Sequence, residues 1–494
     1  MFMGKNTKYW LLAIFMLTLT IRLVLAFFMP NLTYDSYFHL RQVEHISSTG
    51  LPLYNDPLSY GGRTNVFLPL FHYLAAFFAL ILPLELVAKI LPNLLIALIV
   101  PLVYLISKKL TDNQQASILS AVIAGFLPIL YSTDSFTPQT LFLPLLFLSI
   151  YAFLNIKEEF YLYLYIFSMF CLSLTSSGTI LILGGYLIYL VLLAIEKKRI
   201  NRAETEVIIF SFFLYLWTQF LFYKQTLLTE GINFIWQNIP QQILAQYYPQ
   251  LSLAQAIVLV GIIPFVTGIY VVYNSLFNLK NQKAFLLISF VISTTILSWL
   301  KLIEFKLSLS FFAIILAILF SVFYVDLTDY IKKTKFYNYT KKITLILTII
   351  LLLTIVPPAL SFSLDQDTPT TEQVNSFVWL KQNTPEKSVV ASNLREGSLV
   401  SYYGNRKNLM DDQFNLIKKV DQRFDDLNAL FTAKFQTQAL SIYDAYGINY
   451  IVITSKSKQR YGIEELPYLD KNCFELIYNQ ETKIYLIKCK LIGK

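Results

Sequence analysis

Charged residues are scarce in this sequence. Only 14% of its 494 residues are Asp, Glu, Lys or Arg, whereas a soluble globular domain carries about 25%. Hydrophobic residues make up 55% of the chain, and the mean hydropathy is +0.54. So little charge cannot cover the surface of an ordinary soluble protein of this size. The composition therefore indicates an integral membrane protein.

Several common catalytic signatures are also missing. The sequence has no Walker loop, no GxGxxG after a strand, no HExxH and, with three cysteines in all, no CxxC. These absences argue against a P-loop nucleotide site, a dinucleotide-binding fold, a zinc peptidase helix and a redox dithiol. No basic stripe with interleaved aromatic residues is present, so we expect no nucleic-acid partner.

The few charges divide the chain in two. Residues 1–364 hold 23 Lys+Arg and 15 Asp+Glu, a net charge of +8, while residues 365–494 hold 17 and 16, a net charge of +1. We therefore expect a transmembrane domain over 1–364 and a soluble domain over 365–494. Within the second domain, TEQVNSFVWLKQN has helical spacing, and SVVAS, INYIVIT, CFELIY and KIYLIKC read as strands. This pattern predicts a small α/β domain.

The transmembrane region contains eleven apolar segments long enough to cross a bilayer. They lie near 10–29, 86–107, 115–133, 138–154, 160–174, 179–195, 206–223, 251–275, 284–300, 307–325 and 342–361. A further segment, 66–83, is ambiguous, and the positive-inside rule can decide it. If 66–83 does not cross, 16 of the 23 basic residues fall on the cytoplasmic side. We therefore expect 66–83 to be an interfacial or re-entrant helix of a first external loop (30–85), with a cytoplasmic N-terminus and an extracytoplasmic C-terminal domain.

The stretch YDSYFHLRQVEHI, residues 34–46, directly follows the first span. It places Asp35 at the membrane boundary, and all three histidines of the chain, His39, His45 and His72, lie in this neighbourhood. An acid at a membrane boundary is costly unless it is paired, hydrated or metal-bound, so a functional role is the first interpretation. The alternative is a helix N-cap at the membrane surface, a position that favours Asp.

This part of the sequence resembles a known family. Tyr-Asp-Ser-Tyr-Phe-His-Leu-Arg, followed by GLPLYNDPLSYGG and FLPLFHYLAAF, is similar to the first external loop of the catalytic subunit of oligosaccharyltransferases, which are GT-C membrane glycosyltransferases. The resemblance implies a polytopic α-helical membrane protein with the GT-C fold and a C-terminal soluble α/β domain. It also implies that Asp35 is a metal ligand at the catalytic centre. A base that activates the acceptor is the other chemical role open to this carboxylate.

The family completes its metal site with two acids, one residue apart, in the second external loop. Here Asp134 takes the first position and Phe136 the second. Asp35, Asp134 and water would still suit Mg²⁺ or Mn²⁺, which often keep several waters. A helix cap is the alternative role for Asp134. Thr229 and Glu230 match part of the family motif in which a glutamate positions the acceptor, and a solvated loop glutamate is the alternative for Glu230.

Some basic residues on the expected external face run against the positive-inside trend. Lys301 and Lys306 bound the loop KLIEFK at the outer membrane edge. The anionic phosphate of a lipid-linked sugar would explain cations at this position. We expect His39, Arg41 and Arg63 to bind the donor phosphate as well. The alternative for the lysines is contact with ordinary lipid headgroups.

The C-terminal domain departs from the family at one place. SVVASNLREGSLVSYYGNRKNLMDDQF follows the family framework, but Asn393–Gly397 replaces its Trp-Trp-Asp-Tyr-Gly signature. In the family, that signature binds the Ser or Thr of an Asn-x-Ser/Thr acceptor. Acceptor recognition therefore does not carry over to this chain.

Two function classes remain in view. The first is an enzyme that transfers a sugar or glycan from a polyprenyl-phosphate or -diphosphate donor to a protein or glycan acceptor at the extracytoplasmic face. The second is a non-catalytic relative that acts as a scaffold or lipid-binding partner in envelope glycan assembly, which the missing second acid and the lost signature support. A transporter is a third alternative, but paired charged or unwound positions in two repeats are not visible.

Cys473 and Cys489 are the cysteines outside the predicted spans. The segments CFELIY and KIYLIKC alternate around a polar turn, which predicts a hairpin centred on Glu481 with Cys473 directly opposite Cys489. Directly opposed side chains lie close enough for a disulfide. The sequence leaves two outcomes open, a bridge or two free thiols.

Overall fold

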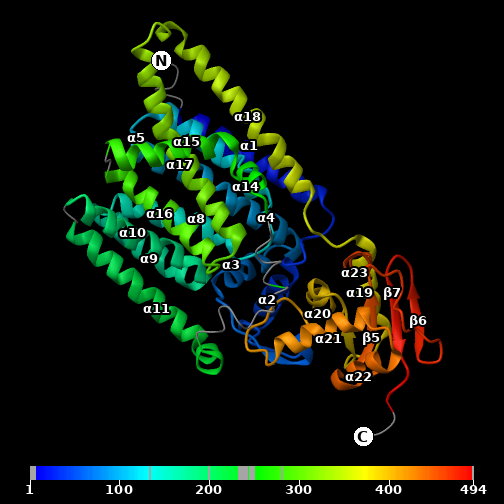
Figure 1. Ribbon diagram of the computed structural model, residues 1–494. Helices are drawn as coiled ribbons and strands as arrows, with labels where there is room; N and C mark the ends of the chain where they lie inside the picture. The colour runs from blue at the N-terminus through cyan, green and yellow to red at the C-terminus, as the bar shows by residue number, and fades with distance from the viewer. Residues whose placement is uncertain are drawn as a thin grey trace.

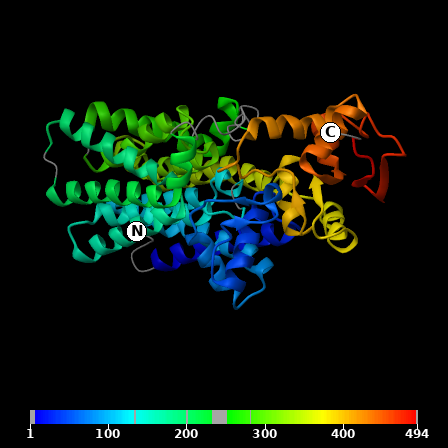
Figure 2. The same ribbon diagram turned by 90° about the horizontal axis from the view of Figure 1, so that it is seen from below.

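The computed structural model describes residues 7–132, 135–198, 201–231, 243, 251–279 and 282–491. The membrane helices gather on one side of the molecule, and the C-terminal domain, yellow to red, lies at the end away from the N-terminus (Figure 1). The view turned by 90° shows the same separation, with the first external loop in blue between the two parts (Figure 2). This loop is therefore where the two domains meet.

Helices form most of the described chain. The N-terminal helix and the first external loop comprise α1 (Thr7–Phe28), α2 (Ser36–Thr49), β1 (Asn55–Asp56), η1 (Ser59–Gly61), β2 (Arg63–Thr64) and α3 (Leu70–Ala79). The helices that follow are α4 (Leu84–Ala97), α5 (Ile99–Thr111), α6 (Gln114–Gly125), α7 (Pro128–Ser132), α8 (Gln139–Leu154), α9 (Glu159–Thr175), η2 (Ser177–Thr179), α10 (Ile180–Ile195), α11 (Arg202–Glu230), α14 (Leu253–Val260), α15 (Ile262–Asn274), η3 (Ser275–Leu279), α16 (Gln282–Trp299), α17 (Phe305–Lys332), η4 (Tyr337–Tyr339) and α18 (Thr340–Leu364). The C-terminal domain comprises α19 (Thr371–Asn383), β3 (Val389–Ala391), η5 (Leu394–Glu396), α20 (Gly397–Tyr402), β4 (Lys407–Asn408), α21 (Val420–Thr432), α22 (Gln436–Tyr446), β5 (Ile448–Ile453), α23 (Ser455–Tyr461), β6 (Phe474–Asn479) and β7 (Lys483–Ile487).

The membrane helices correspond to the predicted spans. Within the described residues, seven helical segments are long and apolar enough to cross a membrane, and α14 with α15 makes an eighth if the pair counts as one bent span. That pair bends by 93° at Gly261, whose φ of 92° lies in the left-handed region that glycine adopts without strain. The shorter apolar helices α8, α9 and α16 complete the eleven predicted segments.

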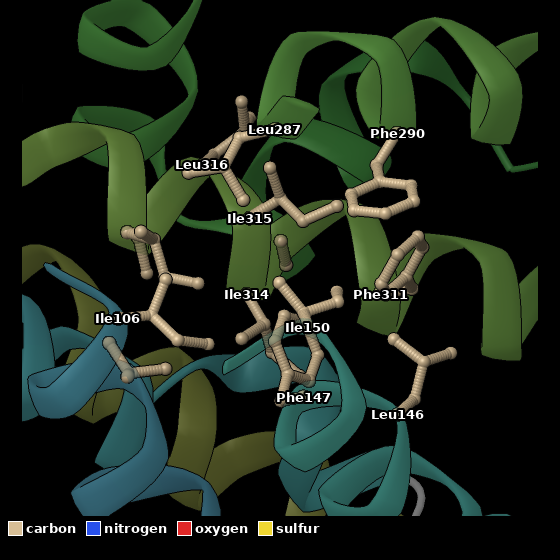
Figure 3. Close-up of a cluster of buried hydrophobic side chains, with 14 of the residues drawn as sticks. Ile106, Leu146, Phe147, Ile150, Leu287, Phe290, Phe311, Ile314, Ile315 and Leu316 are labelled. Atoms are coloured by element: carbon tan, nitrogen blue, oxygen red, sulfur yellow. The ribbon is translucent and has the colours of Figure 1, made fainter. Parts of the chain in front are cut away.

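The centre of the bundle is α17. Phe311, Ile314 and Leu316 on this helix are fully buried, in the cluster drawn in Figure 3. Close helix contact depends on small residues nearby. A Cβ atom added at Gly185 of α10 would lie 1.9 Å from the ring of Phe290 on α16, so only glycine permits this approach. The core is thus packed by shape as well as by hydrophobicity.

The predicted interfacial segment 66–83 contains α3. This helix has ten residues and is about 15 Å long, half the thickness of a hydrocarbon core of about 30 Å. It packs on α2 of the first external loop and on the membrane helix α4. Its length agrees with the expectation that this segment does not cross the membrane.

The C-terminal domain is the predicted α/β domain. Its mixed sheet has five strands in the order β4-β3-β5-β7-β6, with β3 parallel to β4 and β5, and β7 antiparallel to β5 and β6. Alternate residues of β5 face opposite sides. Ile451 and Ile453 pack in a cluster with α21 and α22, while Val452 packs in a cluster that includes α19, α20 and the buried residues of α2. One face of the sheet therefore continues into the first external loop.

Cys473 and Cys489 form a disulfide, with Cα atoms 4.8 Å apart. This confirms the predicted bridge. The predicted register was wrong by one residue at this end, because the pairing shifts between Leu476 and Tyr478. The carbonyl of Cys473 consequently accepts a hydrogen bond from the amide of Lys488 at 2.8 Å. The extra residue of a β-bulge explains the shift.

Candidate active site

Asp35 lies directly before α2, and its side chain is exposed. It occupies the N-cap position, but its carboxylate makes no cap hydrogen bond. Instead, the carbonyl of Thr33 accepts from the amide of Ser36 at 3.0 Å. The structure therefore does not support helix capping as the role of this carboxylate.

Two further carboxyl groups interact with Asp35, and neither was singled out from the sequence. Glu304 precedes α17, and the side-chain amide of Gln139 donates to its carboxylate. Burial, and next the negative charge of Asp35, raise the pKa of Glu304 to about 7. Asp412 comes from the C-terminal domain, and burial, Asp35 and Asp411 raise its pKa to about 7. The charge of Asp35 thus acts on two carboxyl groups from distant parts of the sequence.

Cations of the C-terminal domain also lie beside Asp35. The ammonium of Lys456 lies 4.1 Å from the ring centroid of Tyr34, the residue before Asp35. Burial lowers the pKa of Lys456 to about 8, while the charge of Asp35 opposes the shift. Lys456 and Arg395 both form ion pairs with Asp367. Asp35 thus has an acidic neighbour on the membrane side and mixed charges on the side of the C-terminal domain.

A buried hydrogen-bond network attaches the first external loop to the C-terminal domain. Ser59 Oγ donates to Asp411 Oδ2 at 2.6 Å, and the hydroxyl of Tyr60 donates to the Asp411 carbonyl at 2.6 Å. The amide of Tyr60 donates to Asn408 Oδ1 at 2.7 Å. All four residues are at least 95% buried. Because buried polar groups are costly to leave unpaired, this network fixes the position of Asp412, the next residue along the chain.

A second buried network supports Asn393–Gly397, the segment predicted to replace the family signature. Glu396 is fully buried, and its carboxylate accepts from the hydroxyl of Thr454 and, at 3.4 Å, from the amide of Gln373. Burial raises the pKa of Glu396 to about 7 despite the hydrogen bonds. Gln373 Oε1 accepts in turn from the hydroxyl of Tyr34 at 2.9 Å. This segment is therefore connected to the residue before Asp35.

Two predicted phosphate-binding residues have partners inside the first external loop. Arg41 forms a bidentate ion pair with Asp56, with both N–O distances at 2.7 Å. His39 Nδ1 lies 2.9 Å from His72 Nε2. Burial lowers the pKa of His39 to about 3, so this side chain is neutral at pH 7. In this arrangement Arg41 and the two histidines stabilise the loop, and neither Arg41 nor His39 offers an unpaired positive charge.

The remaining predicted cations lie at different places. Arg63 donates to the carbonyl of Gln413 and lies 5.1 Å from the ring centroid of Tyr60, so it belongs to the contact between the domains. Lys301 and Lys306 are exposed. The charge of Lys306 acts on Glu304 and favours its ionised form. Lys306 thus acts on a carboxyl group that also interacts with Asp35.

Two predicted site residues cannot be placed. Asp134 lies outside the described residues, and so does the side chain of Glu230. Phe136, at the position where the resemblance predicts the second acid, is fully buried, and its ring centroid is 5.0 Å from that of Phe71. Its amide donates to Ser36 Oγ at 3.0 Å. An aromatic core residue therefore occupies the position predicted for the second acid.

The donor chemistry around Asp35 fits a divalent cation. Carboxylate oxygens are the ligands that Mg²⁺ and Mn²⁺ prefer, and a cation would relieve the repulsion of Asp35 with Glu304 and with Asp412. Within the described part of the chain, however, no three His, Cys, Asp or Glu side chains are grouped closely enough to hold one ion. A metal here would therefore depend on few protein ligands and on water.

Known proteins share this architecture. No protein-family model matches the chain. A dolichyl-phosphooligosaccharide-protein glycotransferase of Archaeoglobus fulgidus is 35% identical over 101 residues, a match that spans 19% of this chain and only 17% of that protein. The apo crystal structure of an A. fulgidus oligosaccharyltransferase superposes with a TM-score of 0.70 at 13% identity, covering 93% of this chain and 72% of the other. ArnT from Cupriavidus metallidurans, bound to undecaprenyl phosphate, superposes with a TM-score of 0.56 at 11% identity, covering 99% of this chain and all of ArnT.

Two further solved structures show what such proteins bind. An oligosaccharyltransferase from A. fulgidus, AglB, was solved with an inhibitory peptide and a dolichol-phosphate, and superposes with a TM-score of 0.69 at 12% identity over 91% of this chain and 70% of AglB. An A. fulgidus oligosaccharyltransferase was also solved with Zn and sulfate. The chain described here therefore has the GT-C fold and resembles the catalytic subunit of oligosaccharyltransferases.

Proposed function

We propose that this protein is a membrane glycosyltransferase that moves a sugar or glycan from a polyprenyl-phosphate or -diphosphate donor to an acceptor at the extracytoplasmic face. The observation that carries the proposal is the position of Asp35. Its exposed carboxylate lies where the membrane helices meet the C-terminal domain, and its charge acts on Glu304, before the membrane helix α17, and on Lys456 of the C-terminal domain. A lipid-linked donor reaches this junction from the bilayer, and an acceptor reaches it from water.

The reaction needs a nucleophile, a leaving group and a place for one proton. A hydroxyl or amine of the acceptor attacks the anomeric carbon, the bond from that carbon to the phosphate oxygen breaks, and the polyprenyl phosphate or diphosphate leaves with the electron pair. As a base, Asp35 takes the proton from the acceptor. Lys306 stabilises the negative charge that develops on the leaving phosphate. A divalent cation held by Asp35, with Asp134 or Glu304, would add to that stabilisation.

The proposed orientation places the N-terminus in the cytoplasm and the C-terminal domain outside. Lys108 and Lys109 lie in the last turn of α5. In Figure 1, this helix and the N-terminus lie on the side of the bundle away from the C-terminal domain. The positive-inside rule assigns this basic side to the cytoplasm. The disulfide of the C-terminal domain is consistent with an oxidising compartment.

A transfer assay tests this function. Purified protein is incubated with a labelled polyprenyl-linked sugar, and label is followed into water-soluble or acceptor-bound product. We expect product from the natural protein and none from Asp35→Ala. A non-catalytic, lipid-binding relative is the second candidate, favoured by the buried Phe136 at the position of the second acid. It predicts that neither protein forms product while both bind polyprenyl phosphate equally.

A further inference from the structure

The segment that replaces the family signature presents a cation to solvent. Asn393–Gly397 begins as the 3-10 turn η5, in which the carboxylate of Glu396 accepts from the amide of Asn393 at 3.2 Å. Glu396 is fully buried, whereas the Arg395 side chain between them is 41% exposed. The buried carboxyl group therefore holds the turn, and the guanidinium is available at the surface.

A second cation converges with Arg395 on one acid. Lys456, at the start of α23, is 29% exposed, and both cations pair with the carboxylate of Asp367, which is 42% exposed. Two positive charges share one negative charge, so this triad of Arg395, Lys456 and Asp367 keeps a net positive charge. Guanidinium and ammonium groups bind carboxylate, sulfate and phosphate oxygens through charge-assisted hydrogen bonds.

The triad adjoins the candidate catalytic carboxylate. The carbonyl of Asp367 accepts from the amide of Tyr34 at 3.4 Å, and Lys456 lies over the Tyr34 ring. Tyr34 immediately precedes Asp35 in the sequence. The triad therefore contacts the residue next to Asp35, and the charge of Asp35 acts on Lys456.

The triad also belongs to the aqueous side of the site. Arg395 and Lys456 come from η5 and α23 of the C-terminal domain, and Asp367 precedes α19. Lys306, by contrast, lies in the first turn of the membrane helix α17. The phosphate of a polyprenyl donor stays at the depth of the lipid headgroups because its chain is buried in the bilayer. Cations on α17 are therefore suited to the donor, and the triad is suited to the acceptor.

We propose that Arg395 and Lys456 form an oxyanion site for the acceptor, so that the acceptor carries a carboxylate, sulfate or phosphate close to the group that is glycosylated. This proposal rests on the proposed transferase function. In it, the triad replaces a site for a neutral Ser or Thr side chain by a site for a negative charge. Arg395 and Lys456 are binding residues, and they take no part in bond breaking.

Sulfate is the probe for this site. Its affinity for the purified full-length protein is measured by calorimetric titration at low ionic strength, with and without saturating polyprenyl phosphate. The test variant is the double substitution Arg395→Gln/Lys456→Gln. Lys458→Gln is the matched control, because Lys458 lies on the same helix and its charge acts on Glu465 instead. Lys306→Gln removes a cation on the membrane side.

We expect the double variant to bind sulfate at least about tenfold more weakly, the loss of roughly 1.4 kcal/mol or more. The variants Lys458→Gln and Lys306→Gln, and the presence of polyprenyl phosphate, should each change the affinity for sulfate less than twofold. The charge-preserving variants Arg395→Lys and Lys456→Arg should retain sulfate binding, which separates loss of charge from misfolding. Unchanged affinity in the double variant, no sulfate binding by the natural protein, or displacement of sulfate by polyprenyl phosphate would each overturn the proposal. The titration needs no turnover, so its failure leaves the transferase function to be decided by the transfer assay.

Discussion

Ser59 Oγ donates to Asp411 Oδ2 at 2.6 Å, across 352 positions of the sequence. This buried bond joins the first external loop to the C-terminal domain, beside Asp412, whose pKa responds to Asp35. The membrane domain and the soluble domain therefore meet around Asp35. Substitutions on either side of this contact are expected to affect the chemistry at Asp35.

The first prediction concerns Asp35. Asp35→Asn should lower transfer by about 100-fold or more, the range expected for loss of a catalytic base, while expression and melting temperature stay close to those of the natural protein. The exposed side chain makes no cap hydrogen bond, so packing does not depend on it. Asp365→Asn is the matched control, because it removes an exposed acid just after α18. Transfer by Asp35→Asn within a few-fold of the natural rate would contradict the role.

A second prediction concerns the metal. If Asp35 and few other ligands hold Mg²⁺ or Mn²⁺, a chelator should abolish transfer, and either ion should restore it. Asp134→Asn should raise the metal concentration needed for half-maximal transfer and should cost less activity than Asp35→Asn. Transfer rates at several metal concentrations measure both effects. Full activity after exhaustive chelation would instead indicate that Asp35 acts as a base without metal.

The third prediction concerns topology. A cysteine at Arg202, whose side chain is 92% exposed, should resist a membrane-impermeant thiol reagent applied from outside intact cells. A cysteine at Glu386, exposed in the C-terminal domain, should react under the same conditions. Labelling yields before and after permeabilisation provide the comparison. Labelling of position 202 from outside would contradict the proposed orientation and indicate the opposite one.

The fourth prediction concerns the disulfide. The unfolded, unreduced protein should take up one alkyl group, at Cys171, because Cys473 and Cys489 are bonded to each other. Intact mass after alkylation reads this number directly, and three alkyl groups would exclude the bridge. Cys473→Ser and Cys489→Ser should each lower the melting temperature of the C-terminal domain. The bridge closes a separation of 16 residues, which corresponds to about 3 kcal/mol at most.

The fifth prediction concerns Glu396. Its pKa is about 7 in the folded protein and 4.5 for an ordinary glutamate, so folding favours the protonated form. The resulting stabilisation is fully present below pH 4.5 and is lost as the pH rises through 7. The side chain of Glu396→Gln does not titrate. Between pH 5 and pH 8, the natural protein should therefore lose up to about 2 kcal/mol of unfolding free energy relative to this variant, which is seen as a lower melting temperature.

The control for this measurement is Glu386→Gln, at an exposed position of the same domain. Its melting temperature should follow that of the natural protein across the same pH range. Parallel curves for the natural protein and Glu396→Gln would mean that burial does not perturb this carboxyl group.

Several features of the molecule follow from local sequence. The apolar segments, the helix and strands of the C-terminal domain and the turn of its hairpin depend on composition and periodicity within short windows. The functional interpretation of Asp35 likewise came from its position behind a span and from the motif around it. The bulge between Leu476 and Tyr478 could not be predicted from the sequence, because the alternation of side chains along a strand does not show where one extra residue is inserted.

The composition of the site was decided by tertiary structure. Glu304 stands in the sequence between the two lysines of KLIEFK, but only folding brings it near Asp35. Arg41 and His39 were assigned to phosphate from residue type and position, yet an ion pair and burial determine the charge they offer. Charge depends on distance to other groups and on exposure to water. Those quantities exist only once residues hundreds of positions apart have packed together.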